Sequence, residues 1–373
     1  MDLLSKVRGA GRFGRKLGSL MRIVPAIVAV VCFVMLVVSI VCCTVIWRGR
    51  TDRKTAASWS GGGELSYRHM AVYAHGARAL GEKSPASYLE YGRSLSKTDV
   101  YNIRKSLQNV VDISNGKRRR SGDVPVATEG FADCYSSFIE ADVMSLRQQG
   151  SLGDDKSATA SVYAVGGNFK ACHLFEYMSG GFLPVQPVDK YQIVINDALA
   201  WRFYSSYDVV GEKISLWNKD YTIIGVVREH DGDTPRAYVY FECLEEYCAG
   251  PDASFTPAVL CYEAIMPEQV KNVAVADVRN SVPGYDQSNP GTYVVSVTGR
   301  YSIGSIWDYM MPPGSTSDLL RDYDLPYWEV SAGRAVASMF AWEIVAVVCA
   351  AMGVVMVTVI VVMRRKSGLK PGL

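Results

Sequence analysis

The sequence contains few residues in the arrangements that carry enzyme or metal chemistry. None of its four histidines falls in an H-E-x-x-H or similar ligand spacing. There is no G-x-S-x-G turn for a nucleophilic serine, and a dispersed Ser/His/Asp set has no positive support. The segment nearest to a phosphate loop, 76–84, has Glu82 where that loop needs a lysine. We therefore expect no catalytic residue, no cofactor and no metal ligand, and predict that the chain is not an enzyme.

The nine cysteines form no regular framework. Four of them fall in long apolar stretches, and the other five contain no C-x-x-C pair. An odd number without regular spacing argues against a disulfide scaffold, although one bridge between Cys243 and Cys248 stays open. The five are Cys134, Cys172, Cys243, Cys248 and Cys261.

Charge is absent from two long stretches, residues 23–47 and 344–363. At about 1.5 Å per residue, each is long enough to cross a hydrocarbon layer of roughly 30 Å. The alternative for the first stretch is a cleaved signal peptide. The apolar core of a signal peptide has only about 7 to 15 residues, fewer than residues 23–47, and no A-x-A cleavage site follows the stretch. We predict two transmembrane helices.

The flanks of these stretches predict the topology. The tail 364–373 carries four Lys and Arg, whereas only Arg334 lies close before the second stretch. Because Lys and Arg are retained on the cytoplasmic side, the tail is predicted inside, and the basic residues of 1–22 agree. Basic residues in 48–54 weaken the asymmetry. We expect a two-pass protein of a bacterial plasma membrane, with both termini cytoplasmic and residues 48–335 outside.

In residues 1–22 apolar residues recur every three or four positions, and Lys and Arg occupy much of the opposite face. This pattern is typical of a basic amphipathic helix that lies on membrane lipid. A G-x-G-x-x-G pattern occurs there, but no strand precedes it, so it predicts no dinucleotide site. Acidic residues outnumber basic ones in 48–335, which argues against nucleic acid as a partner. We interpret the one basic run, 117–120, as a solvated loop, with a site for anionic polymers or lipid headgroups as the alternative.

The region between the spans mixes helix and strand patterns. Residues 55–65 are small and polar and predict a linker, and 96–111 predict a helix capped by Ser or Thr. From 159 onward short alternating runs predict strands, with a hairpin turn at Asn218 and Lys219 and a helix capped by Asn196. Further on, residues 258–282 predict a strand followed by a helix with Pro267 near its start. The acidic run 229–233 lacks calcium-loop spacing and is interpreted as a solvated turn.

The second span and a membrane-proximal segment take residues 336–363. Glu343 borders the span beside Trp342, so we expect it at the outer interface, with a buried contact between helices as the alternative. Small residues recur at four-residue spacing, which permits close helix packing. This candidate packing face consists of Ala346, Cys349, Ala350 and Gly353.

Residues 159–227 contain a run of weak motifs in a recognisable order. They read as a Gly and Phe pair before a helix, a G-x-F turn, a V-I-N-type strand that enters a helix, a G-x-K-I strand and a closing Y-x-x-I-G-V strand. In this order the run resembles the extracytoplasmic core domain of MacB-type ABC transporter permeases, which are related to FtsX-like permeases. Gly181 departs from the family, which has Arg there. The matching residues, structural in role, are Gly166, Phe169, Gly180, Phe182, Asn196, Ala200, Phe203, Gly211, Lys213 and Gly225.

The resemblance implies an α+β ectodomain between the two transmembrane helices. It would have a ferredoxin-like part next to the membrane and an inserted β-rich part at about 125–250. It also implies a subunit that works with a cytoplasmic ABC ATPase in the export or release of a peptide, lipoprotein or drug-like substrate. A membrane-anchored binding or sensor module without transport activity is the alternative.

One departure from the family concerns the spans. Family members of the usual kind have four, three of them after the ectodomain, whereas this sequence offers two. We therefore expect a further permease subunit as a partner, in a homo- or hetero-oligomer.

Overall fold

The computed structural model describes most of the chain, in segments. They are residues 3–60, 66–75, 94–116, 130–146, 156–229, 233–250, 256–268, 270, 273–283, 292–311 and 324–368. The basic run 117–120 lies outside them. The chain forms two compact units: one comprises residues 1–50, 306–310 and 333–373, and the other 51–305 and 311–332.

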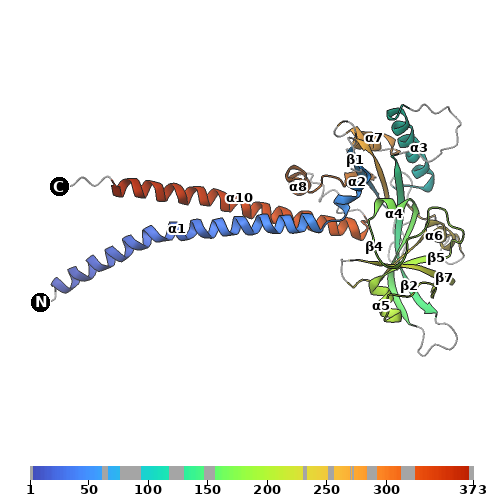
Figure 1. Cartoon of the computed structure of the whole chain (residues 1–373), viewed down its shortest axis with the longest axis horizontal. Helices are drawn as coiled ribbons and strands as arrows, with labels where there is room; N and C mark the ends of the chain where they lie inside the picture. Colours follow the sequence, from blue (N-terminus) through green and yellow to red (C-terminus); the bar gives the residue numbers. More distant parts are fainter. Residues whose placement is uncertain are drawn as a thin grey trace. The chain divides into compact units, whose positions relative to one another are not determined.

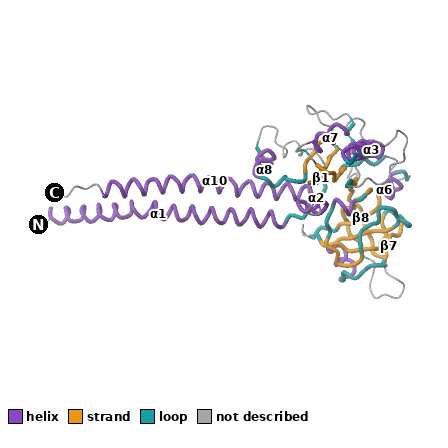
Figure 2. Tube along the Cα trace, turned by 45° about the horizontal axis from the view of Figure 1, so that its top comes forward, coloured by secondary structure: helices purple, strands orange, loops and turns teal. Residues whose placement is uncertain are grey.

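The first unit is dominated by two long helices, α1 (Leu3–Gly49) and α10 (Tyr327–Gly368). Figures 1 and 2 both show them running side by side, with the start of α1 and the end of α10 at the same end of the pair. Each contains a segment long and apolar enough to cross a membrane. Large apolar side chains such as Phe33 and Val354 are exposed along them, as expected where lipid would cover the surface.

The helix expected over 1–22 is present from Leu3 onward, but it is not a separate element. Instead α1 runs without interruption from Leu3 through the apolar stretch, with Pro25 inside it. A proline removes one backbone donor and bends a helix more often than it ends it when apolar residues continue on both sides. The basic segment is therefore continuous with the first span.

Three of the four residues on the predicted packing face lie on the partly covered side of α10. They are Ala346, Cys349 and Gly353, whereas Ala350 is exposed. A Cβ atom added to Gly353 would lie 3.9 Å from Cβ of Cys32 on α1. Gly353 of α10 thus packs against α1 of the same chain.

The second unit is built on a ten-stranded sheet with the order β10-β1-β9-β2-β3-β8-β5-β7-β4, and β6 pairs with β2 and β7. Its helices are α2 to α7, part of α8 and the first residues of α10. The expected α+β class is confirmed. The strands are β1 (Ser66–Ala74), β2 (Ala132–Leu146), β3 (Ser157–Gly167), β4 (Glu176–Gly180), β5 (Gln192–Asn196), β6 (Lys213–Leu216), β7 (Lys219–Arg228), β8 (Arg236–Tyr240), β9 (Cys261–Glu268) and β10 (Thr292–Ser296). The helices are α2 (Asp52–Ser60), α3 (Lys97–Ser114), α4 (Phe169–Cys172), α5 (Asp197–Tyr204), α6 (Phe241–Cys248), α7 (Val273–Ser281) and α8 (Ile303–Met310).

Strand β2 joins the two sides of this sheet. It pairs with β9 through residues 132–136 and with β3 through residues 134–144. One hydrogen-bonded sheet continues through the predicted membrane-proximal part and the predicted inserted part. The division of the ectodomain into these two parts therefore remains a prediction.

Local sequence signals correctly placed several boundaries. Ser96 caps α3 in a capping box with Asp99, and Asn196 caps α5 by accepting from the Leu199 N–H. The hairpin is present one residue earlier than expected: its turn residues are Trp217 and Asn218, both with positive φ, as in a type I′ turn.

Two local expectations are wrong. Residues 55–60 of the predicted linker 55–65 belong to α2, because Thr55 and Ala56 are buried and Trp59 packs on Tyr67. Residues 61–65 lie outside the described part of the chain. Pro267 lies in β9, and the helix after it begins only at Val273, so the apolar alternation of the strand outweighs the helix-start signal of proline.

We expect Gly353→Leu to loosen the contact between α1 and α10, because the larger side chain would occupy the space next to Cys32. Maleimide labelling of Cys32, located by mass spectrometry in detergent-solubilised protein, should become faster. Val354→Leu is the matched control, since Val354 is exposed. Unchanged Cys32 labelling in Gly353→Leu would contradict this arrangement.

Candidate functional site

Helix α10 begins inside the second unit, and its first turn is bound to the core by polar contacts. We call Tyr327, Trp328 and Glu329 the anchor turn. Each of them contacts a buried charged residue from a different part of the second unit. The turn itself is closed by the hydrogen bond from Glu329 N–H to Pro326 O. Three consecutive residues are thus held in three directions.

Tyr327 binds Glu229, which follows β7. The Tyr327 hydroxyl donates to Glu229 Oε1 over 2.9 Å, and Tyr238 donates to the same oxygen. The other carboxylate oxygen pairs with Arg236 Nη1 at 2.7 Å and accepts from Asn196 Nδ2 at 3.2 Å. The Arg236 guanidinium also lies 4.0 Å from the centre of the Tyr327 ring. The solvated turn expected around residue 229 is wrong for Glu229, which is buried because these donors replace water.

Glu329 faces the other edge of the sheet. Its Oε2 accepts from the Tyr73 hydroxyl over 2.6 Å and forms an ion pair with Arg300 Nη2 at 2.8 Å. Only 1% of Glu329 is exposed. An unpaired charge at this depth would be strongly destabilising, so Arg300 and Tyr73 keep Glu329 in place.

Trp328 reaches a third carboxylate, Glu263 in the middle of β9. The indole Nε1–H donates to Glu263 Oε1 over 3.0 Å, and His69 Nε2 lies 2.9 Å from Oε2. His173 Nε2 lies 3.1 Å from the same Oε2, but its angle does not satisfy a hydrogen bond. Thiols surround the carboxylate, and Cys261 Sγ donates to Oε1 over 3.4 Å. We call the following residues the Glu263 cluster: His69, Cys134, Cys172, His173, Cys261 and Glu263.

The sheet register brings the Glu263 cluster together. Cys134 on β2 pairs directly with Glu263, and His69 on β1 pairs with Ile265, two positions along β9 from Glu263. Residues two apart on a strand face the same side, so these side chains share one face of the sheet. Cys172 ends α4 and His173 follows it, which places both against that face.

Electrostatic effects at these carboxylates follow from burial and from their partners. Burial alone would raise the pKa of Glu263, but the imidazoles of His173 and His69 outweigh it and hold that pKa well below its usual range. Burial, reinforced by the neighbouring carboxylate, raises the pKa of two tyrosines well above the usual value: Tyr73 beside Glu329 and Tyr238 beside Glu229. Tyr262, buried beside Asp133, behaves in the same way.

The residues of the family run occupy structural positions near the anchor turn. Asn196 is fully buried and binds Glu229, the partner of Tyr327. Phe169 stacks on His173 with ring centres 4.2 Å apart, and Phe182 stacks on Phe169. Ala200 and Phe203 fill the core beneath α5, while Lys213 is exposed and contributes its carbonyl to the Tyr204 hydroxyl.

Glycine is required where β4 meets β7. Gly180 has φ +65°, and a Cβ atom there would lie 2.1 Å from Ile224 O. A Cβ on Gly225 would lie 2.0 Å from Gly181 O. Both backbones therefore approach more closely than any side chain allows.

A cleft of about 330 Å³ lies beside these aromatic residues. It is lined mainly by apolar groups, among them Phe169, Phe182, Leu183 and Tyr240, with Lys190 and Glu242 as charged members. Its volume falls at the lower end of the range of small-molecule clefts, about 300–1,000 Å³.

Sequence reasoning placed the family run but missed both the anchor turn and the Glu263 cluster. Metal-ligand motifs are recognised in a sequence when the ligands lie close together in the chain. His69 and Glu263 are 194 positions apart, so no such motif marks them. Two local signals were available: the Cys172–His173 dipeptide, and the alternation of Cys261 with Glu263 on one strand face. Glu343 accepts from the Trp307 indole of α8 over 2.9 Å, but both residues are only partly buried. The outer-interface position and the buried contact between helices therefore both stay predictions.

Comparisons with known proteins agree with the resemblance seen in the sequence. Residues 89–275, half of the chain, match the family model described as MacB-like periplasmic core domain. No curated protein matches. Among solved structures, the periplasmic region of MacB from Actinobacillus actinomycetemcomitans is 12% identical, with 62% of this chain and 89% of that chain covered and a TM-score of 0.41. The extracellular domain of YknZ, a noncanonic ABC-type transporter from Gram-positive bacteria, is 9% identical, with 61% and 99% covered and a TM-score of 0.38.

The raised pKa values of Tyr73, Tyr238 and Tyr262 predict loss of stability at alkaline pH. Their stabilising effect is complete below the unfolded-state pKa of about 10 and is lost as pH rises further, because only the unfolded chain can then release these protons. In an alkaline titration, tyrosinate absorbance should rise in two phases, exposed tyrosines first and buried ones together with unfolding. A single phase near pH 10 (the ordinary value) without unfolding would contradict the burial of these hydroxyls.

Proposed function

Because this chain belongs to the family of the MacB-like periplasmic core domain, we propose that it is a subunit of an ABC transporter complex in which its ectodomain transmits or receives ATP-driven motion. The chain is a membrane protein of the MacB/FtsX-like permease family with a large extracytoplasmic domain. The ATP-driven motion would export or release a peptide, lipoprotein or drug-like substrate. The apolar cleft beside Phe169 is a candidate binding site for such a molecule.

The observation that carries this proposal is the anchor turn. Helix α10 is one continuous helix of 42 residues from Tyr327 to Gly368, so it contains both the anchor turn and the second span. Its first three residues bind Glu229, Glu263 and the Arg300–Tyr73 pair. A helix bonded in this way cannot turn or slide without displacing β1, β9 and the end of β7. Movement of the span and movement of the ectodomain would therefore be coupled.

The partners follow from the same proposal. ATP hydrolysis would be supplied by a cytoplasmic ABC ATPase subunit, and a further permease subunit would complete a homo- or hetero-oligomer. The exposed apolar side of α10, including Ala350 and Val354, offers a surface for that subunit, since the side with Gly353 packs on α1. The basic start of α1 would contact membrane lipid.

We also propose that both termini are cytoplasmic. Antiparallel packing of α1 and α10 brings the first residues of α1 and the last of α10 to one end (Figure 1). That end carries Arg364, Arg365 and Lys366, in agreement with retention of basic residues inside the cell.

Trp328→Phe should weaken the coupling, because it leaves Glu263 Oε1 without the indole donor. Loss of a hydrogen bond to a charged group costs about 1.5–3 kcal/mol. Tagged full-length chain purified from its native membranes should bring down an ATPase subunit, and the ATP hydrolysis rate of that complex should fall in the variant while the subunits stay associated.

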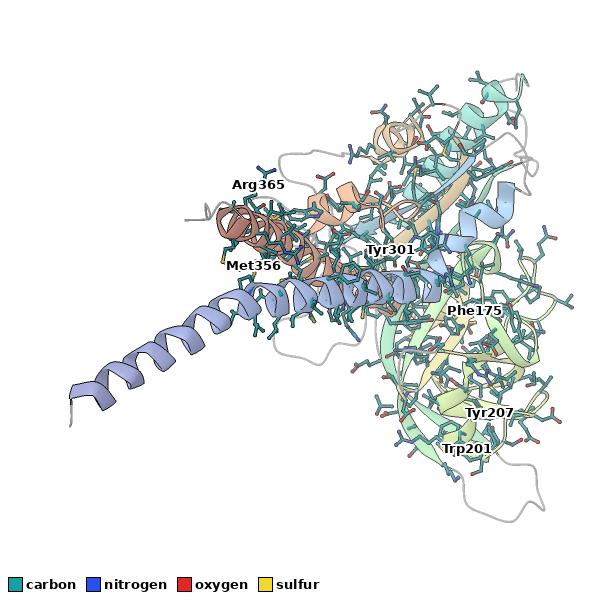
Figure 3. All side chains as sticks on the ribbon, turned by 60° about the vertical axis from the view of Figure 1, so that its left-hand side comes forward. Phe175, Trp201, Tyr207, Tyr301, Met356 and Arg365 are labelled. Carbon is teal, nitrogen blue, oxygen red and sulfur yellow. The ribbon has the colours of Figure 1, made fainter. Side chains whose placement is uncertain are left out.

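Trp201→Phe is the matched control, since Trp201 is 56% exposed and packs on Tyr207 at the surface of α5 (Figure 3). Equal hydrolysis rates in both variants would contradict coupling through the anchor turn. Purification of the chain alone with a ligand bound to its ectodomain would instead support a membrane-anchored sensor.

Topology has its own measurement. The Lys370→Cys variant should resist a membrane-impermeant maleimide on intact cells and become labelled after the cells are permeabilised. A second variant, Ile113→Cys, provides the positive control, because Ile113 is an exposed residue of α3 and should be labelled from outside. Labelling of the Lys370→Cys variant at position 370 on intact cells would overturn the proposed orientation.

A further inference from the structure

The Glu263 cluster gathers more metal-binding side chains than a structural core needs. Within it, the ligand atoms of His69, Cys172 and Glu263 lie within 4.8 Å of one another, and so do those of Cys134, His173 and Glu263. Glu263 belongs to both sets, which therefore meet at one carboxylate. The thiols of Cys134 and Cys172 also lie against each other.

The distances fit ligands of one ion. Glu263 Oε2 is 2.9 Å from His69 Nε2 and 3.1 Å from His173 Nε2. An ion bound tetrahedrally with bonds of about 2.0–2.1 Å would hold two such atoms roughly 3.3 Å apart. Small outward shifts of these side chains would be enough to admit the ion.

The orientation of the His173 ring also favours a shared metal ion. Its Nε2 is buried and lies within reach of Glu263 Oε2, but it is not aligned for a hydrogen bond and has no other partner among the described residues. Ligands of a common ion direct their lone pairs at the ion and not at each other, which produces short distances with poor hydrogen-bond angles. Buried polar atoms without partners are costly, and an ion would satisfy this one.

The donor set selects the metal. Imidazole, thiolate and carboxylate together suit zinc, whereas calcium and magnesium take oxygen ligands. We propose that the Glu263 cluster binds one zinc ion through Glu263, His69, His173 and at least one thiolate of the Cys134–Cys172 pair. This inference replaces the expectation, drawn from spacing along the chain, that no histidine binds metal.

The site would be structural and enclosed. His69 is 3% exposed and Glu263 2% exposed, and the His173 ring is held between Phe169 and Trp328. Zinc would tie β1, β2, β9 and the end of α4 to one point. Through the Trp328–Glu263 hydrogen bond it would also fix the orientation of a carboxylate that the anchor turn uses.

The experiment uses full-length chain in detergent, without an ATPase and with a phosphine reductant that does not bind metal. After dialysis, elemental analysis should find about one zinc per chain. Replacement of zinc by Co²⁺ should give the visible d–d bands of tetrahedral cobalt and the ultraviolet charge-transfer band of a cobalt–thiolate bond.

Variants then assign the ligands. Glu263→Gln should lower zinc affinity, and the double variant C134S/C172S should abolish the charge-transfer band. The matched control is C243S/C248S, which removes two buried cysteines outside the cluster and should change neither measurement. Trp328→Phe, which alters only a partner of a ligand, should lower zinc affinity about 10–100-fold.

Three outcomes would overturn the zinc site. They are a folded wild-type chain with neither zinc nor a cobalt spectrum, equal loss of metal in the control double variant, and a Cys134–Cys172 disulfide found by intact mass in zinc-free protein purified without the reductant. The cobalt titration of the wild-type chain decides the matter even if Glu263→Gln fails to fold. Zinc binding needs no transport partner, so its failure would leave the proposed transport role standing.

Discussion

Three buried carboxylates fix the position at which helix α10 begins. Glu229, Glu263 and Glu329 lie away from water, where an unpaired charge costs several kcal/mol. Each is held by aromatic hydroxyl, indole, imidazole or guanidinium groups, and the anchor turn takes part in all three arrangements. Apolar packing alone would let the helix rotate or slide by small amounts, because it has no direction. Hydrogen bonds to charged groups have direction, so they set one register for the helix.

Strand β9 is the element on which both sites depend. It lies between β1 and β2, and its buried side chains alternate between the two faces of the sheet. Glu263 therefore meets His69 from one neighbouring strand and Cys134 from the other, while Trp328 approaches from α10. A polar group at the centre of a sheet is tolerated only where the neighbouring strands supply its partners, and here they supply more than one carboxylate requires.

The sequence predicted those features whose causes are local. The cap at Ser96, the cap at Asn196 and the tight hairpin after β6 each depend on a few adjacent residues, and all three are present. Residues 55–60 were misread because their burial depends on distant side chains and backbone groups such as Ala171 O, which accepts from the Trp59 indole. The anchor turn escaped notice for the same reason: Glu329 and Tyr73 are 256 residues apart, and no pattern along the chain joins them.

The late position of the anchor turn in the chain has a consequence for biosynthesis. Glu229, Glu263 and Arg300 are synthesised before Tyr327, Trp328 and Glu329, so during translation they wait without some of their partners. The contacts of the anchor turn form only after translation has passed residue 329, near the start of α10. A chain that stops before residue 327 would leave Arg300 without Glu329 and would remove one partner each from Glu229 and Glu263. The ectodomain would be less stable and more open to proteolysis. Completion of the ectodomain core thus requires translation to reach the first turn of α10, the helix that contains the second span.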